Sequence, residues 1–249
     1  MRLIAAFAVL LALSPAPSQA AVRSRRKTGT LNLRKRLHVS TLIAEPGTGE
    51  LDLGGLYSIS NTTFGVPATL RYTPQGSHIA WGLTEFSASF DSLNSVTAAS
   101  TSVLYDGDKF DFALSPQATV FLRDESGVRL GAAAIARYDT GKSSVGATAG
   151  WTGATHSSAT NPAGTLDLGC GFGRRLAAEG KLAKFTAHGN GVWERSTGQP
   201  GAILAFEGVE FELTDRVSVD LSGQHLGLRA GKPDHQVVLG ITIGFGRGH

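Results

Sequence analysis

The stretch His235-Gln236-Val237-Val238-Leu239-Gly240-Ile241-Thr242-Ile243-Gly244-Phe245 lies at the end of the chain and decides its fold. Large apolar residues stand at every second position from Val237 to Phe245, and most positions between them are small or polar. A β-strand with this pattern has one oily face and one small or polar face. In lipid every backbone amide needs a partner, so a membrane sheet must close with its first and last strands paired. We therefore expect an all-β protein, an antiparallel transmembrane β-barrel that closes on this strand.

The first 20 residues have the features of a secretory signal peptide. Met1-Arg2 is a short positive region, Leu3 to Leu13 is an apolar run, and Ser18-Gln19-Ala20 has the small-x-small pattern of a cleavage site. The apolar run is about half of the roughly 20 residues that a helix needs to cross a bilayer, so we predict export with cleavage near Ala20. No later stretch is long and apolar enough for a membrane helix, which leaves a soluble exported protein or a barrel.

The composition fits the barrel. Of the 249 residues, those after the signal are enough for about twelve strands of roughly 10 residues with their turns, and we accept ten to twelve. The 32 glycines are scattered through alternating segments and do not gather in a linker. The single cysteine, Cys170, excludes an intramolecular disulfide framework and a cysteine-rich zinc site. It shares the parity of the neighbouring leucines, which predicts a small residue facing lipid.

The segment 21–46 forms a basic arm ahead of a barrel domain that we assign to 47–249. The arm carries seven basic residues against Glu45 alone, whereas acidic residues outnumber basic ones from Gly47 onward. It is expected either as a solvated periplasmic tail or as an attachment to anionic lipid headgroups or cell-wall polymer. Leu31 to Val39 could also add a short strand. Export argues against a nucleic-acid partner.

Alternation between apolar and polar residues repeats along the barrel domain and predicts twelve strands. They cover 51–59, 64–72, a segment ending near 90, 96–105, 110–122, 128–138, 145–151, 165–174, 184–194, 202–213, 217–228 and 235–245. The segment 145–151 could instead belong to a long loop over 139–163. Pro116 predicts a bulge or two shorter strands, because proline cannot donate to the ladder. A second bulge is expected near Glu207-Gly208, where the apolar parity changes.

If the oily parity faces lipid, the other parity faces the interior and carries charges of both signs. This lining is compatible with a hydrated pore whose selectivity depends on charge, or with ion pairs that fill the interior. The predicted pore-lining residues are Arg71, Asp111, Arg129, Arg137, Asp167, His188, Glu194 and Asp220.

The chain offers little for catalysis. The seven histidines are dispersed without a His-Glu-x-x-His pair, so we predict no metal, no cofactor and no catalytic residue. His78, His156, His225 and His235 are expected in loops or interfaces. One enzymatic alternative stays open, in which His188 or His225 lies near a lipid-facing serine.

Aromatic residues fall near the predicted strand ends, where they could form the two girdles of a membrane barrel. A soluble β-sandwich would instead pack them in one core. These residues are Tyr57, Tyr72, Trp81, Tyr105, Tyr138, Trp151 and Trp193.

Three segments carry a family resemblance. They are 50–55 with 66–72 in the front hairpin, the run from Phe211 to Val219, and the run from Pro233 to Phe245. In their patterns and turns they resemble the bacterial outer-membrane transporter barrels of the meta-pathway phenol degradation type. The last eight residues before Gly246 are also similar to the signal by which the barrel assembly machinery recognises its substrates, although Val238 replaces the usual polar residue and 246–249 extends past the terminal aromatic.

Together these features predict an outer-membrane barrel with a periplasmic N-terminus that acts as a narrow channel or passive transporter for small solutes. The expected partners are outer-membrane lipids, the barrel assembly machinery, which would bind the C-terminal strand, and a solute that the sequence does not identify. The alternatives are a non-conducting structural or surface-interaction barrel and a soluble periplasmic β-sandwich that binds a ligand.

Overall fold

The computed structural model describes residues 47–59, 62–74, 78–79, 82–91, 95–107, 109–121, 127–157, 163–177, 184–214, 216–228 and 233–246. The predicted signal peptide, the basic arm and Trp81 lie outside these residues. Among the described residues, no helix is long and apolar enough to cross a membrane.

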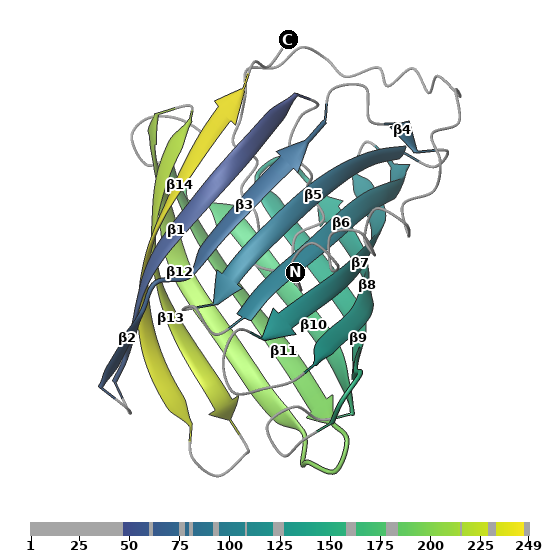
Figure 1. Ribbon diagram of the computed structural model, residues 1–249. Helices are drawn as coiled ribbons and strands as arrows, with labels where there is room; N and C mark the ends of the chain where they lie inside the picture. The colour runs from purple at the N-terminus through teal and green to yellow at the C-terminus, as the bar shows by residue number, and fades with distance from the viewer. Residues whose placement is uncertain are drawn as a thin grey trace.

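The described residues form one antiparallel sheet in which neighbours along the chain pair with each other (Figure 1). Its strands are β1 (Thr48–Ser58), β2 (Thr63–Gly65), β3 (Ala68–Thr73), β4 (His78–Ile79), β5 (Gly82–Asp91), β6 (Ser95–Asp106), β7 (Phe110–Phe121), β8 (Val128–Asp139), β9 (Ser143–Ala154), β10 (Gly164–Arg175), β11 (Phe185–Ser196), β12 (Ala202–Thr214), β13 (Val217–Leu228) and β14 (Asp234–Gly246). β2 and β3 both pair with β1 and act as one interrupted strand, whereas β4 pairs only with β5. In the described part of the chain the wall therefore has twelve strands, as the alternation predicts.

The sheet closes through its first and last strands. β1 pairs with β14 along its whole length, from Thr48 opposite Gly246 to Ser58 opposite Gln236. Figure 1 shows the yellow β14 beside the dark β1, with the tilted strands forming a cylinder. This closure confirms the barrel and excludes the β-sandwich, because a sandwich leaves two open sheets.

The outer wall is oily and exposed. On β9 and β10 exposed residues alternate with less exposed ones, so that Val145, Trp151 and Leu168 point outward and Cys170 is exposed beside them. Strands of 10 to 13 residues suit a tilted crossing of the hydrocarbon layer. The exposed aromatic residues stand toward the strand ends in two groups, which are Tyr72, Tyr105, Phe110, Tyr138, Phe172 and Phe245 toward the end where β1 begins, and Tyr57, Phe64 and Trp151 toward the opposite end.

The strand at 145–151 is present, and the long-loop alternative over 139–163 is wrong. β9 pairs with β8 and β10 over its full length, from Ser143 to Ala154. Its many glycines, serines and threonines lowered its apolar signal, but exposed residues still alternate with less exposed ones from Val145 to Trp151.

Two predicted bulges are wrong. β7 runs unbroken through Pro116, which lies opposite Ala132 of β8, and the irregularity lies on β6 between Val103 and Tyr105. A side-chain hydrogen bond of 2.9 Å joins Thr101 and Ser115 beside the proline, where no backbone pair with β6 forms. The outward-parity residues Ala98, Ala118 and Val120 of this region are buried and pack as a small apolar cluster.

β12 likewise keeps one register with β11 from Phe185 opposite Phe211 to Glu194 opposite Ala202, so no bulge lies near Glu207. Its irregularities against β13 lie near the two ends of the strand. Leu204 and Phe206 therefore share the inward parity of Glu210 and Glu212, and Glu207 faces outward with the exposed Val209.

Candidate functional site

The inner face of the barrel holds all eight of the predicted residues, supplied by β3, β7, β8, β10, β11 and β13. Their placement follows from strand parity, because the exposed apolar residues of the same strands occupy the alternate positions. The structure brings them together as three arginine groups and one histidine pair, distributed around the wall.

The first group joins β1 and β3. The Nη1 atom of Arg71 lies 3.5 Å from the Asp52 carboxylate and 3.9 Å from the Glu50 carboxylate. Arg71 stands directly opposite Glu50 in the register of the two strands. One guanidinium is therefore shared between two carboxylates.

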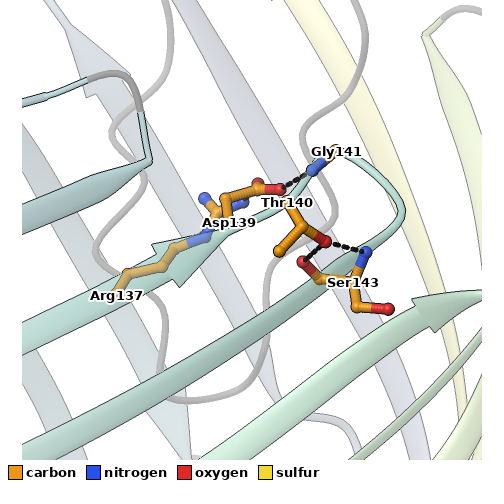
Figure 2. A network of polar contacts seen from close by, with 5 residues as sticks. All are labelled: Arg137, Asp139, Thr140, Gly141 and Ser143. Atoms are coloured by element: carbon orange, nitrogen blue, oxygen red, sulfur yellow. Dashed lines mark hydrogen bonds and ion pairs between the residues drawn. The ribbon is translucent and has the colours of Figure 1, made fainter.

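The second group lies at the turn between β8 and β9 (Figure 2). Arg137 is 5% exposed, forms an ion pair with Asp139, and stands opposite Asp111 of β7. Asp139 also accepts a hydrogen bond of 2.6 Å from the amide of Gly141, whose φ of +83° suits glycine at this turn. The carboxylate that closes the turn thus also holds the arginine.

The third group lies near the opposite end of the barrel. The Arg129 guanidinium donates hydrogen bonds to the hydroxyls of Thr152, at 3.0 Å, and Thr165. Asp167 and Glu194 stand opposite each other on β10 and β11, and both interact electrostatically with Arg129. Here two hydroxyls orient the arginine toward a carboxylate pair.

The histidine pair reaches across a whole strand. His188 of β11 bonds the carboxylate of Asp220 on β13, with Gly208 of β12 between them. A Cβ at position 208 would lie 2.8 Å from Cε1 of His188 and 2.6 Å from the Cβ of Ser222. Only glycine leaves room for this contact.

A separate polar cluster lies on the outer wall, where His225 and His235 are strand residues and not loop residues. Nε2 of His225 lies 2.7 Å from the Glu207 carboxylate, and the Nδ1 atoms of the two histidines are 2.8 Å apart. The two rings meet edge to face at 5.0 Å. One of the facing nitrogens must carry a hydrogen and the other a lone pair, so the rings hold complementary tautomers.

Among the described residues, no hydrogen bond joins a serine to His188 or to His225. The outward positions of β12, β13 and β14 contain no serine near His225. On the inner wall the Ser222 hydroxyl has no hydrogen-bond partner among the described residues, so it forms no pair with His188. Within the same part of the chain, no group of three histidine, cysteine or acidic side chains is arranged to hold a metal ion.

Sequence reasoning missed several of these residues. Glu50 has the same inward parity as Asp52, so the alternation could have found it. The outer cluster of Glu207, His225 and His235 was missed, because a bulge expected near Glu207 placed that side chain on the inner face. The hydroxyl partners of Arg129 depend on the register of three strands, for which the sequence carries no signal.

No protein-family model and no curated protein sequence matches this chain. Its fold is similar to that of the solved NanC porin, with a TM-score of 0.60 and 11% sequence identity over 78% of this chain and 98% of that chain. It is also similar to the KdgM porin, with a TM-score of 0.58 and 10% identity over 79% of this chain and 99% of that chain. A second KdgM structure, in complex with disordered oligogalacturonate, aligns with a TM-score of 0.55 and 10% identity over 79% of this chain and 99% of that chain. At these identities the likeness concerns the fold.

Proposed function

We propose that this protein is an integral outer-membrane β-barrel that works as a narrow channel for small solutes. The observation that carries the proposal is a closed wall with an oily outer face and a charged inner face. Eight strands make a barrel that side chains can fill, whereas 16 to 18 leave a wide aqueous channel. Twelve strands leave room for a narrow passage, and charged inward residues keep such a passage hydrated.

The same proposal covers location and assembly. Export by residues 1–20 would deliver the chain to the periplasm, and an even strand number would leave both ends of the barrel domain on the periplasmic side. The C-terminal strand β14 would then be recognised by the barrel assembly machinery. The sequence patterns of the front hairpin and of 211–245 support a place among transporter barrels of the phenol-degradation type. We assign no catalytic residue.

The oligogalacturonate found with the KdgM porin is not proposed as a solute here. Galacturonate units are carboxylates, and among the inward residues that the structure describes carboxylates outnumber arginines. Repulsion between like charges would disfavour a polyanion in this interior.

A non-conducting barrel is the second candidate, and the burial of inward side chains favours it. Arg137, His188 and Thr73 are buried although they face the interior. A barrel whose ion pairs cross-link a filled interior would have the same feature. The two candidates differ in whether solutes cross the membrane.

Solute release from liposomes tests this choice. The signal-free chain would be refolded, and only material whose gel mobility changes on heating would be reconstituted with a small fluorescent solute inside the vesicles. A channel releases the small solute and retains a dextran of several kilodaltons. Heat-unfolded protein from the same batch is the control. Retention of the small solute by vesicles that contain a heat-modifiable barrel would support the filled barrel instead.

A further inference from the structure

Burial of the inward side chains differs between the two ends of the barrel. We call the end where β1 begins, at Thr48, the near end, and the end where β14 begins, at Asp234, the far end. Many inward side chains toward the near end are buried, and they come from β1, β3, β6, β7, β8, β11 and β13. They are Thr48, Glu50, Thr73, Val103, Ala113, Ser115, Ile135, Arg137, Thr186, His188, Ser218 and Ser222. On β12 and β14 the inward residues between the strand centre and the near end are half-buried, so the lumen is narrowed there and not closed.

Toward the far end the inward side chains are more exposed. Most of those that the structure describes are half-buried, and the buried ones are Ser58, Thr165, Ser196 and Val238. Ser58 donates a hydrogen bond of 2.7 Å to Asp234, and a hydrogen bond of 2.9 Å joins Thr165 to Ser196. Short hydroxyl side chains that bond along the wall cannot reach across the interior. The far end therefore has the wider lumen.

Larger side chains, joined in pairs, account for the burial toward the near end. The ion pairs there are Arg71 with Glu50, Arg137 with Asp139, and His188 with Asp220. Val103 and Ala113 pack as a buried apolar cluster, and Ile135 stands opposite Ala113 on the next strand. A side chain that points into the interior and is still buried must pack against other interior groups. These contacts take up cross-section at this end.

The charged side chains toward the far end stand further apart. Arg129 donates to the hydroxyl of Thr152 at 3.0 Å, and among the described residues no carboxylate lies within ion-pair distance of it. Asp167 and Glu194 interact with it only electrostatically. All three side chains are half-buried. Their separation leaves space that water can fill.

We propose that the channel has its constriction toward the near end, built from these ion pairs and from the Val103, Ala113 and Ile135 side chains, and a wide vestibule at the far end. The inference rests on the proposed channel function and deepens it. The constriction sets the largest solute that passes, since pore diameter and lining decide passage at the narrowest point. With the N-terminus on the periplasmic side, the vestibule opens to the outside of the cell.

Single-channel conductance in 1 M potassium chloride tests this placement, because charge effects are screened beyond about 3 Å at that concentration. Ile135→Ala shortens an inward aliphatic side chain toward the near end, and Leu204→Ala shortens its isomer toward the far end. The narrowest segment of a pore carries most of its resistance, so Ile135→Ala is expected to raise the conductance roughly one and a half to twofold. Leu204→Ala is the matched control and should keep the wild-type conductance.

Polymer exclusion on the wild-type channel provides a measure that needs no change in the constriction. Uncharged polyethylene glycols of increasing size are added to one side of the bilayer, and those that enter the lumen lower the current. Larger polymers are expected to enter from the far end than from the near end. The orientation of each channel is read from a bulky thiol label on Gln199→Cys, in the turn between β11 and β12 at the far end, in a Cys170→Ser background.

Each outcome decides a separate point. A conductance that rises equally in both variants, only in Leu204→Ala, or in neither overturns the placement of the constriction and leaves the channel intact. If Ile135→Ala does not give a heat-modifiable barrel, polymer exclusion decides, and equal limits from both sides or a larger limit from the near end overturn the inference. A folded wild-type barrel without any current overturns the channel itself, and the constriction with it.

Discussion

Arg71 has two carboxylate partners with resolved distances, so its charge can be removed with a defined result. Arg71→Gln removes the guanidinium that Glu50 and Asp52 share on the inner wall. We expect the ratio of cation to anion permeability to rise roughly two- to fivefold, from an interaction of about 1 kcal/mol for a unit charge near the ion path. Reversal potentials would be compared with those of Arg195→Gln, which removes an exposed arginine from the outward parity of β11. Equal ratios for both variants would contradict the inward role of Arg71.

Gly208 is the residue on which the contact between His188 and Asp220 depends. In Gly208→Ala the new methyl group would overlap Cε1 of His188 and the Cβ of Ser222. Overpacking of this kind typically costs about 1–3 kcal/mol. The variant should therefore unfold at lower denaturant concentration in lipid vesicles. Gly191→Ala is the control, since its Cβ would meet nothing nearer than the Leu204 carbonyl at 4.0 Å. Equal midpoints for the two variants would show that the space at Gly208 is not needed.

For single residues, the sequence predicted which face of the sheet a side chain points to, but not which residues it contacts. Parity alone placed Arg129 and His188 on the inner face. Some of their partners come from strands two positions away around the wall, such as Thr165 for Arg129 and Asp220 for His188. Those distances depend on register, which is set by the closed ladder and not by local sequence.

Strand β12 shows where the alternation misleads. Leu204 and Phe206 are apolar and face inward, so the parity appeared to change although the strand keeps its register. The interior of a barrel accepts some apolar side chains, so an inward leucine does not require a bulge. The actual irregularities lie near the strand ends, between Ile203 and Ala205 and between Glu212 and Thr214.

The position of a residue along its strand should determine how much a lipid-facing charge lowers the free energy of unfolding. Leu239 is exposed near the centre of β14, and Leu213 is exposed one residue before β12 ends. Arginine at the centre of the membrane costs about 2–4 kcal/mol, and near the interface about 0–1. We therefore expect Leu239→Arg to lower the free energy of unfolding in lipid vesicles much more than Leu213→Arg. The reverse order, or equal costs, would argue that the outer wall does not face lipid.

The architecture of the whole molecule was largely predictable, because closure leaves a signature in the last strand. The alternation from Val237 to Phe245 predicted a strand with an oily face, and β14 pairs with β1 through the matching segment. The strand number followed from repeated alternation, with 145–151 as the least certain element. The distribution of charge between filled and hydrated parts of the interior could not be predicted, since it depends on the diameter and stagger of the wall.

Ionic strength provides a test of the interior charge as a whole. If fixed charges on the inner wall set the selectivity, mobile ions should screen them, since the Debye length falls from about 10 Å at 0.1 M to about 3 Å at 1 M salt. Any preference between potassium and chloride should therefore be larger at 0.1 M than at 1 M, measured as reversal potentials at a constant concentration ratio. A preference that does not change with salt would point to pore size and not to charge.

Single-channel recording of the refolded, signal-free protein tests whether this barrel conducts. Only heat-modifiable material would be added to a planar bilayer, so that the recorded species is a closed barrel. We expect discrete, uniform current steps, which heat-unfolded protein should not give. A closed barrel that inserts into the bilayer and carries no current over the accessible voltage range would contradict it, and the inner wall would then be the cross-linked filling of a structural barrel.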